Sequence, residues 1–167
     1  MRVRALLTAV LALATGLVLA QTAAGANDFK EIEASAPPAY HKEKLIAIDM
    51  PSSGSLKYGV DPDTLLVGSD GVVRYVMVAY NQGSVNALYE GLRCETGEVK
   101  TYARSSELGH WTLVQQPTWR RFDMSAATRH TLALAKQGVC EGSRLAASKA
   151  SDLIRLLRTP LASQRPY

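Results

Sequence analysis

Cysteines, aromatic residues and recognisable catalytic motifs are all scarce in this chain of 167 residues. Neither the two cysteines nor the three histidines have the spacing of a metal-ligand pair. G-x-S-x-G, Walker A, C-x-x-C, H-E-x-x-H and Rossmann glycine patterns are absent. Asp61-Pro62-Asp63 begins like a calcium loop, but Leu66 and Val72 stand where that loop needs Gly and Glu. We therefore expect no cofactor and no metal, and catalytic residues cannot be assigned from motifs.

A long hydrophobic run occurs only at the N-terminus. Two arginines precede an apolar, small-residue stretch from 5 to 20, and Ala24-Gly25-Ala26 offers a cleavage pattern, with Val18-Leu19-Ala20 as an earlier alternative. This arrangement predicts a secretory signal peptide over residues 1–26. The run is shorter than the roughly 20 apolar residues of a bilayer span, and no cysteine near its end suggests a lipid anchor. We expect a periplasmic or secreted protein without a membrane span after cleavage.

Charge of one sign does not dominate the chain. Its formal net charge is +4, and loss of Arg2 and Arg4 with the signal peptide would lower it to +2. This balance gives no argument for a nucleic-acid partner. The remaining chain of about 140 residues is long enough for one domain with its own core.

The two cysteines, Cys94 and Cys140, predict one disulfide, because an even cysteine count is typical of disulfides in exported proteins. The chain-entropy model gives a crosslink of this span about 4 kcal/mol. The alternative is a pair of free, buried thiols.

Turn residues divide the centre of the chain into short apolar runs. Asp70-Gly71 is a strong hairpin signal, and further turns fall at 81–84 and 95–98. Such short turns imply antiparallel pairing. The strands are expected at 45–50, 64–67, 72–80, 85–94 and 99–104.

Towards the C-terminus the spacing of the apolar residues changes from the alternation of strands to the period of helices. Ser125 is a suitable N-cap for a helix over 126–137, and Gly138 suits its C-terminal end. A second helix is expected from about Ser148 to the residue before Pro160. Residues 27–44 are predicted to be a linker or arm, residues 45–160 a single domain and residues 161–167 a tail. The fold class is α+β: an antiparallel meander of four to five strands with two C-terminal helices packed on one face.

Several blocks of this sequence, in order, resemble the CNP1-like family. These blocks are Val60-Asp61, 66–75, 89–94, Tyr102-Ala103-Arg104, Trp111 and Trp119-Arg120. The resemblance covers roughly residues 45–140. It implies a small exported protein of Gram-negative bacteria, and it provides no catalytic residues to carry over.

The predicted meander assigns each side chain to a face of the sheet, because side chains alternate along a strand. Pairing Tyr80 with Val85, and Cys94 with Val99, places Val73, Tyr75, Met77, Ala79, Leu88, Leu92, Cys94, Val99 and Ala103 on a core face. Asn86 and Glu90 also fall on this face and need partners or a bulge. The opposite face carries Arg74, Tyr89, Arg93, Lys100, Tyr102 and Arg104, beside Val72, Val76 and Val78.

This cationic, tyrosine-bearing face is the candidate site for an anion or a partner. In the expected register Tyr89 lies opposite Arg104, and Gly91 lies between Arg74 and Tyr102. Arginine forks bind carboxylates and phosphates. The alternative is a solvated face, or one covered by the 27–44 arm through its acids Asp28, Glu31, Glu33 and Glu43. The same uncertainty concerns Trp111 and Trp119, which either close the core or form a ligand-binding edge with Arg120 and Arg121.

Two classes of function remain open. The first is a non-enzymatic binding or accessory module of the cell envelope, whose partner is an anionic envelope component or a periplasmic protein. The second is an envelope hydrolase or isomerase with an unrecognised site. Glu90 and His130 are the only pair that the sequence nominates for catalysis, although a helical histidine is more often structural.

Overall fold

A large antiparallel sheet forms the centre of the computed structural model, which describes residues 29–50, 54–107 and 109–159. The predicted signal peptide and tail lie outside the described residues. Within them the sheet has eight strands, more than the four to five that were predicted. The antiparallel sheet and the two C-terminal helices agree with the predicted α+β class. The strands are β1 (Ile46–Ile48), β2 (Lys57–Val60), β3 (Leu66–Val67), β4 (Val73–Tyr80), β5 (Val85–Arg93), β6 (Glu98–Glu107), β7 (His110–Leu113) and β8 (Arg120–Arg121).

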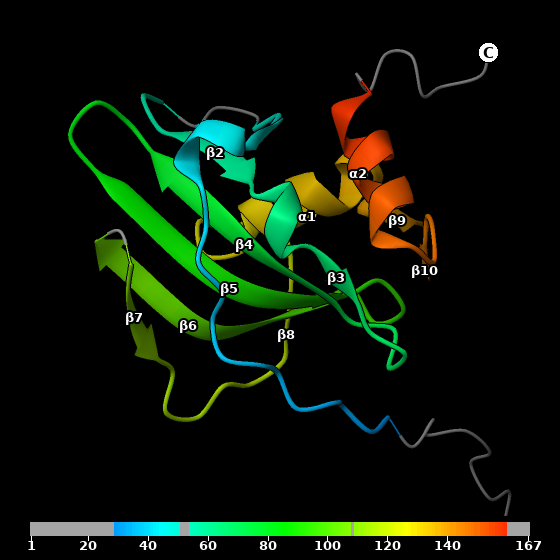
Figure 1. Cartoon of the computed structure of the whole chain (residues 1–167). Helices are drawn as coiled ribbons and strands as arrows, with labels where there is room; N and C mark the ends of the chain where they lie inside the picture. The colour runs from blue at the N-terminus through cyan, green and yellow to red at the C-terminus, as the bar shows by residue number, and fades with distance from the viewer. Residues whose placement is uncertain (1–28, 51–53, 108, 160–167) are drawn as a thin grey trace, which may run out of the picture.

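Three long strands, β4, β5 and β6, make up the middle of the sheet. The order along the sheet is β1-β2-β4-β5-β6-β7, while β3 pairs with β4 and β8 pairs with β6 (Figure 1). The strands missed in the sequence are short and lie beside these long ones. They gain their stability from pairing with a neighbour and carry too few residues for a periodic pattern.

The β4–β5 hairpin has the predicted register, with Tyr80 opposite Val85 and Arg74 opposite Gly91. The β5–β6 register differs from the prediction, because Val99 lies opposite Leu92 rather than Cys94. A bulge between Tyr89 and Glu90 then shifts the pairing again. A bulge adds an unpaired residue to one strand and moves the residues beyond it to the other face.

Because of the bulge, two residues of β6 lie on the opposite face of the sheet from the one predicted. Ala103 lies opposite Tyr89 and packs on the face away from the helices, although it was expected in the core. Arg104 lies opposite Leu88, which packs on the helix side. Directly opposed residues share a face, so Arg104 lies on the helix side of the sheet, where it is exposed.

The two C-terminal helices are α1 (Arg129–Leu134) and α2 (Ala150–Arg158). The first starts three residues later than predicted, because the Ser125 carbonyl accepts the Thr128 and Arg129 N–H groups in a preceding turn. A π-helical turn, η3 (Ala135–Val139), continues α1 to the short β9–β10 hairpin (Cys140–Glu141 and Arg144–Leu145). None of the helices in the described part of the chain is long and apolar enough to cross a membrane.

Gly138 permits the close approach of η3 to α2. Its φ of 144° lies where residues with side chains are rare, and a Cβ there would stand 3.1 Å from the Leu156 Cβ. The predicted disulfide is confirmed: Cys94, just after β5, is bonded to Cys140, with 5.6 Å between the two Cα atoms. This bond ties the helical region to the sheet.

The side chain of Gln137 lies against the outer edge of β1. Its Oε1 accepts the Asp49 N–H at 2.9 Å, and its Nε2 donates to the Ala47 carbonyl at 2.8 Å. The amide therefore provides one donor and one acceptor to the strand, as a neighbouring backbone would.

Both faces of the sheet are covered. The helices pack over one face around Tyr75, Met77 and Leu92. The second apolar cluster, around Val76, Tyr89 and Tyr102, lies on the opposite face, together with residues of the N-terminal segment (Figure 1). We call the face away from the helices the outer face, and residues 29–41 the arm.

Candidate functional site

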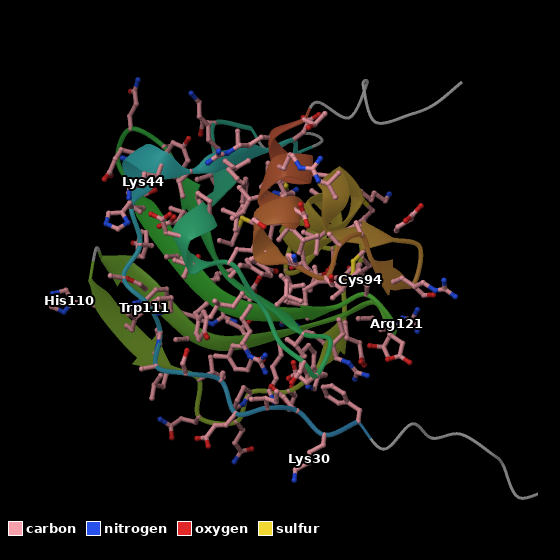
Figure 2. The ribbon with its side chains drawn as sticks, turned by 45° about the vertical axis from the view of Figure 1, so that its right-hand side comes forward. Lys30, Lys44, Cys94, His110, Trp111 and Arg121 are labelled. Carbon is pink, nitrogen blue, oxygen red and sulfur yellow. A yellow bond between two sulfur atoms is a disulfide. The ribbon has the colours of Figure 1, made fainter. Side chains whose placement is uncertain are left out.

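The arm runs across the outer face, which is the face that the sequence nominated for binding. Figure 2 shows Trp111 beside the arm, Lys30 pointing away from the molecule, and Cys94 at the side of the helices. The arm thus corresponds to the alternative in which residues 27–44 cover this surface. Its contacts show what the surface is able to hold.

Glu31 of the arm is held by three donors. Its Oε2 accepts Lys100 Nζ at 2.7 Å and the Trp119 indole N–H at 3.0 Å, and its Oε1 accepts the Tyr102 hydroxyl at 2.8 Å. Burial alone would raise the pKa of Glu31, but these hydrogen bonds outweigh it and lower the pKa below its ordinary value. Lys100, Tyr102 and Trp119 therefore form a carboxylate site.

The next residue, Ile32, is held by its backbone. Its N–H donates to Asp70 Oδ2 at 2.9 Å, and its carbonyl accepts from Arg74 Nη2. The Asp70 and Arg74 side chains are only 1% and 7% exposed and pair with each other at 2.8 Å. Burial raises the pKa of Asp70, but bonds from Arg74 and from the Ile32 and Val72 N–H groups lower it overall. This ion pair presents a donor and an acceptor to one residue of an extended chain.

Phe29 lies on Arg93. The guanidinium carbon is 3.5 Å from the centre of the Phe29 ring, within the range of a cation–π contact. The Trp119 ring meets Phe29 edge-on at 6.0 Å between centroids. Arg93 also approaches Glu98 at 3.5 Å, so its charge is balanced while its face remains available for stacking.

Further along the arm the contacts become fewer. The Ser35 hydroxyl is 3.3 Å from that of Tyr89, and the Trp111 indole N–H donates to the Pro38 carbonyl at 3.2 Å. Tyr40 packs edge-on against Trp111. Trp111 and Trp119 are thus half-buried and both contact the arm, and Trp111 also packs against the apolar cluster of the outer face.

Tyr102 covers Gly91. A Cβ at Gly91 would stand 2.5 Å from the Tyr102 hydroxyl oxygen and 2.9 Å from Val72 Cγ1. The β5–β6 register places Lys100, not Tyr102, directly opposite Gly91, yet the Tyr102 ring still fills the glycine gap. The missing side chain is what allows the Tyr102 hydroxyl to reach Glu31.

The outer face therefore brings together Arg74, Tyr89, Arg93, Lys100 and Tyr102 of the predicted set, and Arg104 is not among them. Sequence reasoning missed Asp70 and Phe29. Asp70 belongs to a turn that explained it fully, and Phe29 lies far from the strands it contacts. The acidic residues of the arm were the only signal that pointed to this arrangement.

The nominated pair of Glu90 and His130 is in contact, with 2.9 Å between Oε2 and Nε2. Tyr75 and Thr101 also donate to the Glu90 carboxylate, at 3.0 and 3.1 Å. Burial alone would raise the pKa of Glu90, but the bonds from His130, Tyr75 and Thr101 lower it overall. Glu90 has no exposed surface. The pair is therefore placed to hold α1 on the sheet, and the partners that Glu90 was expected to need are present.

One group of three metal-ligand types occurs in the described residues: His41, Asp61 and Asp63, with candidate ligand atoms within 4.8 Å of one another. Asp61 already accepts the His41 and Asp63 N–H groups, at 2.7 and 3.0 Å. Lys44 binds Asp63 at 2.8 Å. Asp61 thus caps the short 3₁₀ turn of Pro62–Thr64, and the carboxylate of Asp63 is occupied by its ion pair with Lys44.

The contacts of Glu31 predict that the arm detaches in acid. A carboxylate with a lowered folded-state pKa stabilises the bound form above its unfolded pKa of about 4.5, and this stabilisation is lost as the pH falls through the lower folded value. We expect Trp119 fluorescence to stay constant from pH 7 to about 5 and to change below about 4.5. Asp70 titrates in the same direction. Glu31→Gln should remove the Glu31 part of the change, and an identical profile would contradict this role.

These features define an α+β protein with disulfide-linked helices on one sheet face and an N-terminal arm bound to the other. The chain belongs to the CNP1-like family, whose model matches residues 24–158 and confirms the resemblance seen in the sequence. No curated protein matches the chain, and no solved structure matches it either.

Proposed function

We propose that this chain is a non-enzymatic binding module of the cell envelope, exported to the periplasm, and that it recognises an anionic ligand or partner through its outer face. The observation that supports this proposal is the carboxylate site of Lys100, Tyr102 and Trp119. These residues hold the Glu31 carboxylate through one charged and two neutral donors. Charge-assisted bonds of this kind are roughly twice as strong as neutral ones.

Space for a larger ligand lies beside the carboxylate site. An open groove of about 460 Å³ runs between the arm and the connection that follows β7, over Tyr89 and Tyr102. Leu113 lines this groove and is 61% exposed. An anionic group in the carboxylate site could thus be joined to an apolar part in the groove.

An enzyme has weaker support. The nominated Glu90 carboxylate is fully buried and forms hydrogen bonds with four side chains, those of Tyr75, Thr101, His130 and Thr131. General acid–base catalysis requires contact with the proton that is moved, directly or through one water. A structural role explains the contact between Glu90 and His130, and such a role does not require access to a substrate.

The test is to empty the carboxylate site and then offer it a free carboxylate. The mature chain with Glu31→Ala should bind N-acetylglutamate, whose side chain offers the same carboxylate as Glu31, with a Kd on the order of 1 mM, which corresponds to about 4 kcal/mol. Trp119 fluorescence reports the titration. Adding Lys100→Gln should abolish binding, whereas Arg104→Gln, on the other face, should leave it unchanged. Absence of saturable binding in a folded Glu31→Ala variant would contradict the proposal.

A further inference from the structure

We propose that the outer face is a peptide-recognition site for an extended segment with an aromatic residue followed, two positions later, by an acidic residue. Its partner is a separate protein that carries such a segment and displaces the arm. The inference rests on the proposed function and names the class of partner. It follows from the way in which Phe29, Glu31 and Ile32 are each held.

Recognition of the backbone distinguishes a peptide from other anions. Asp70 accepts the N–H of Ile32 while Arg74 donates to the carbonyl of the same residue. A simple carboxylate or a phosphate ester dianion presents no donor to Asp70, whereas every extended peptide residue other than proline presents both a donor and an acceptor. The side chain of Ile32 is 47% exposed, so this position places little demand on residue type.

The two side-chain positions supply the specificity. Phe29 lies on Arg93 and against the edge of Trp119, and the Glu31 carboxylate lies among Lys100, Tyr102 and Trp119. Side chains two residues apart point to the same side of an extended chain. The spacing of aromatic and acid therefore lets both side chains face the sheet at once, and Trp119 contacts both of them.

The chemistry of the surface favours an acidic partner. Arg74 is paired with Asp70, and Arg93 with Glu98. Lys100 pairs with Glu31 at 2.7 Å, so it is the cation that a carboxylate of the partner would meet. A buried ion pair is weak evidence for stability, since replacing it with apolar residues often costs nothing. The Asp70–Arg74 pair holds both backbone groups of Ile32, and this is the contact that an extended peptide would reproduce.

The arm acts as an internal competitor in this arrangement. A tethered segment has an effective concentration in the millimolar range, so a partner must bind more tightly than the arm to replace it. Weakening the arm should therefore raise the affinity for an external peptide.

The experiment uses a fluorescein-labelled peptide with the sequence of residues 29–36, FKEIEASA, and the mature chain carrying Phe29→Ala and Glu31→Ala. Fluorescence anisotropy should show binding to this variant at least about tenfold tighter than to the wild-type chain. A peptide with glutamine in place of its first glutamate should bind about tenfold more weakly. Lys100→Gln in the same background should weaken binding to a similar extent, and Arg104→Gln should not.

Two parallel measurements separate the possible failures. Equal binding of the glutamate and glutamine peptides would overturn the motif. If N-acetylglutamate binds the variant but the peptide binds no tighter, the peptide inference is overturned while the proposed function stands. If neither binds and the melting temperature is unchanged, both are overturned. Light scattering tests whether a second copy of the chain occupies the site. Wild-type dimers that are lost in the Phe29→Ala/Glu31→Ala variant would show that a second copy, and not a separate protein, binds there.

Discussion

His130→Ala is expected to lower the free energy of unfolding by about 2–3 kcal/mol, because it removes a hydrogen-bond partner from the fully buried Glu90 carboxylate. The side chain is 5% exposed, binds the fully buried Glu90 carboxylate at 2.9 Å and stacks on Tyr58. Without His130 the carboxylate keeps only hydroxyl donors. Urea denaturation followed by circular dichroism measures the loss.

The loss of stability in the His130→Ala variant should depend on pH. In the wild-type chain the pKa of Glu90 is lowered, so its contribution to stability is present above the unfolded value of 4.5 and lost as the pH falls through the folded value. Removing His130 raises the pKa of Glu90, so protonation then favours the folded variant. The difference between the two proteins should therefore shrink below about pH 4.5.

A double-mutant cycle tests the pairing itself. Glu90→Leu with His130→Leu should cost less than the sum of the two single substitutions, because neither polar group is then buried alone. His110→Ala is the matched control: His110 is exposed on β7, and its loss should change stability by no more than about 0.5 kcal/mol. Additive effects at Glu90 and His130 would show that the two side chains act independently.

Removing the disulfide is expected to cost about 4 kcal/mol. Cys94 follows β5 and Cys140 begins β9, 46 residues further along the chain, so the bond closes a long loop in the unfolded state. Cys94→Ala/Cys140→Ala avoids placing a new hydroxyl at the buried Cys94. The midpoint of urea denaturation should fall in this variant, and reduction of the wild-type chain should lower it equally. A loss below about 1 kcal/mol would mean that the helices are held by packing alone.

Much of the fold follows from local sequence. The Tyr80–Val85 pairing follows from a short turn between two β-rich runs, and the disulfide was predicted from the even number of cysteines. The bulge at Tyr89 and Glu90 could not be read from alternation, because one extra residue changes the face without changing the composition. The other misfit in the pattern, the buried Glu90, is explained by its hydrogen-bond partners and not by the bulge.

The candidate site was predicted less completely for a different reason. Alternation gathered Arg74, Arg93 and Tyr102 on one face, since they belong to paired strands. Phe29 and Glu31 reach that face from a segment without periodicity, about 40 to 70 residues away in the chain. Contacts of that separation leave no local pattern. Composition could only indicate that an acidic arm and a basic face are complementary.

The side-chain amide of Gln137 affects the tendency of the protein to self-associate. An open strand edge recruits strands from other molecules, and proteins protect such edges by several means. At β1 the groups that a foreign strand would use, the Asp49 N–H and the Ala47 carbonyl, are already bonded to one side chain. An opening of the helical layer that removed Gln137 would free these two backbone groups for pairing with a strand of another molecule.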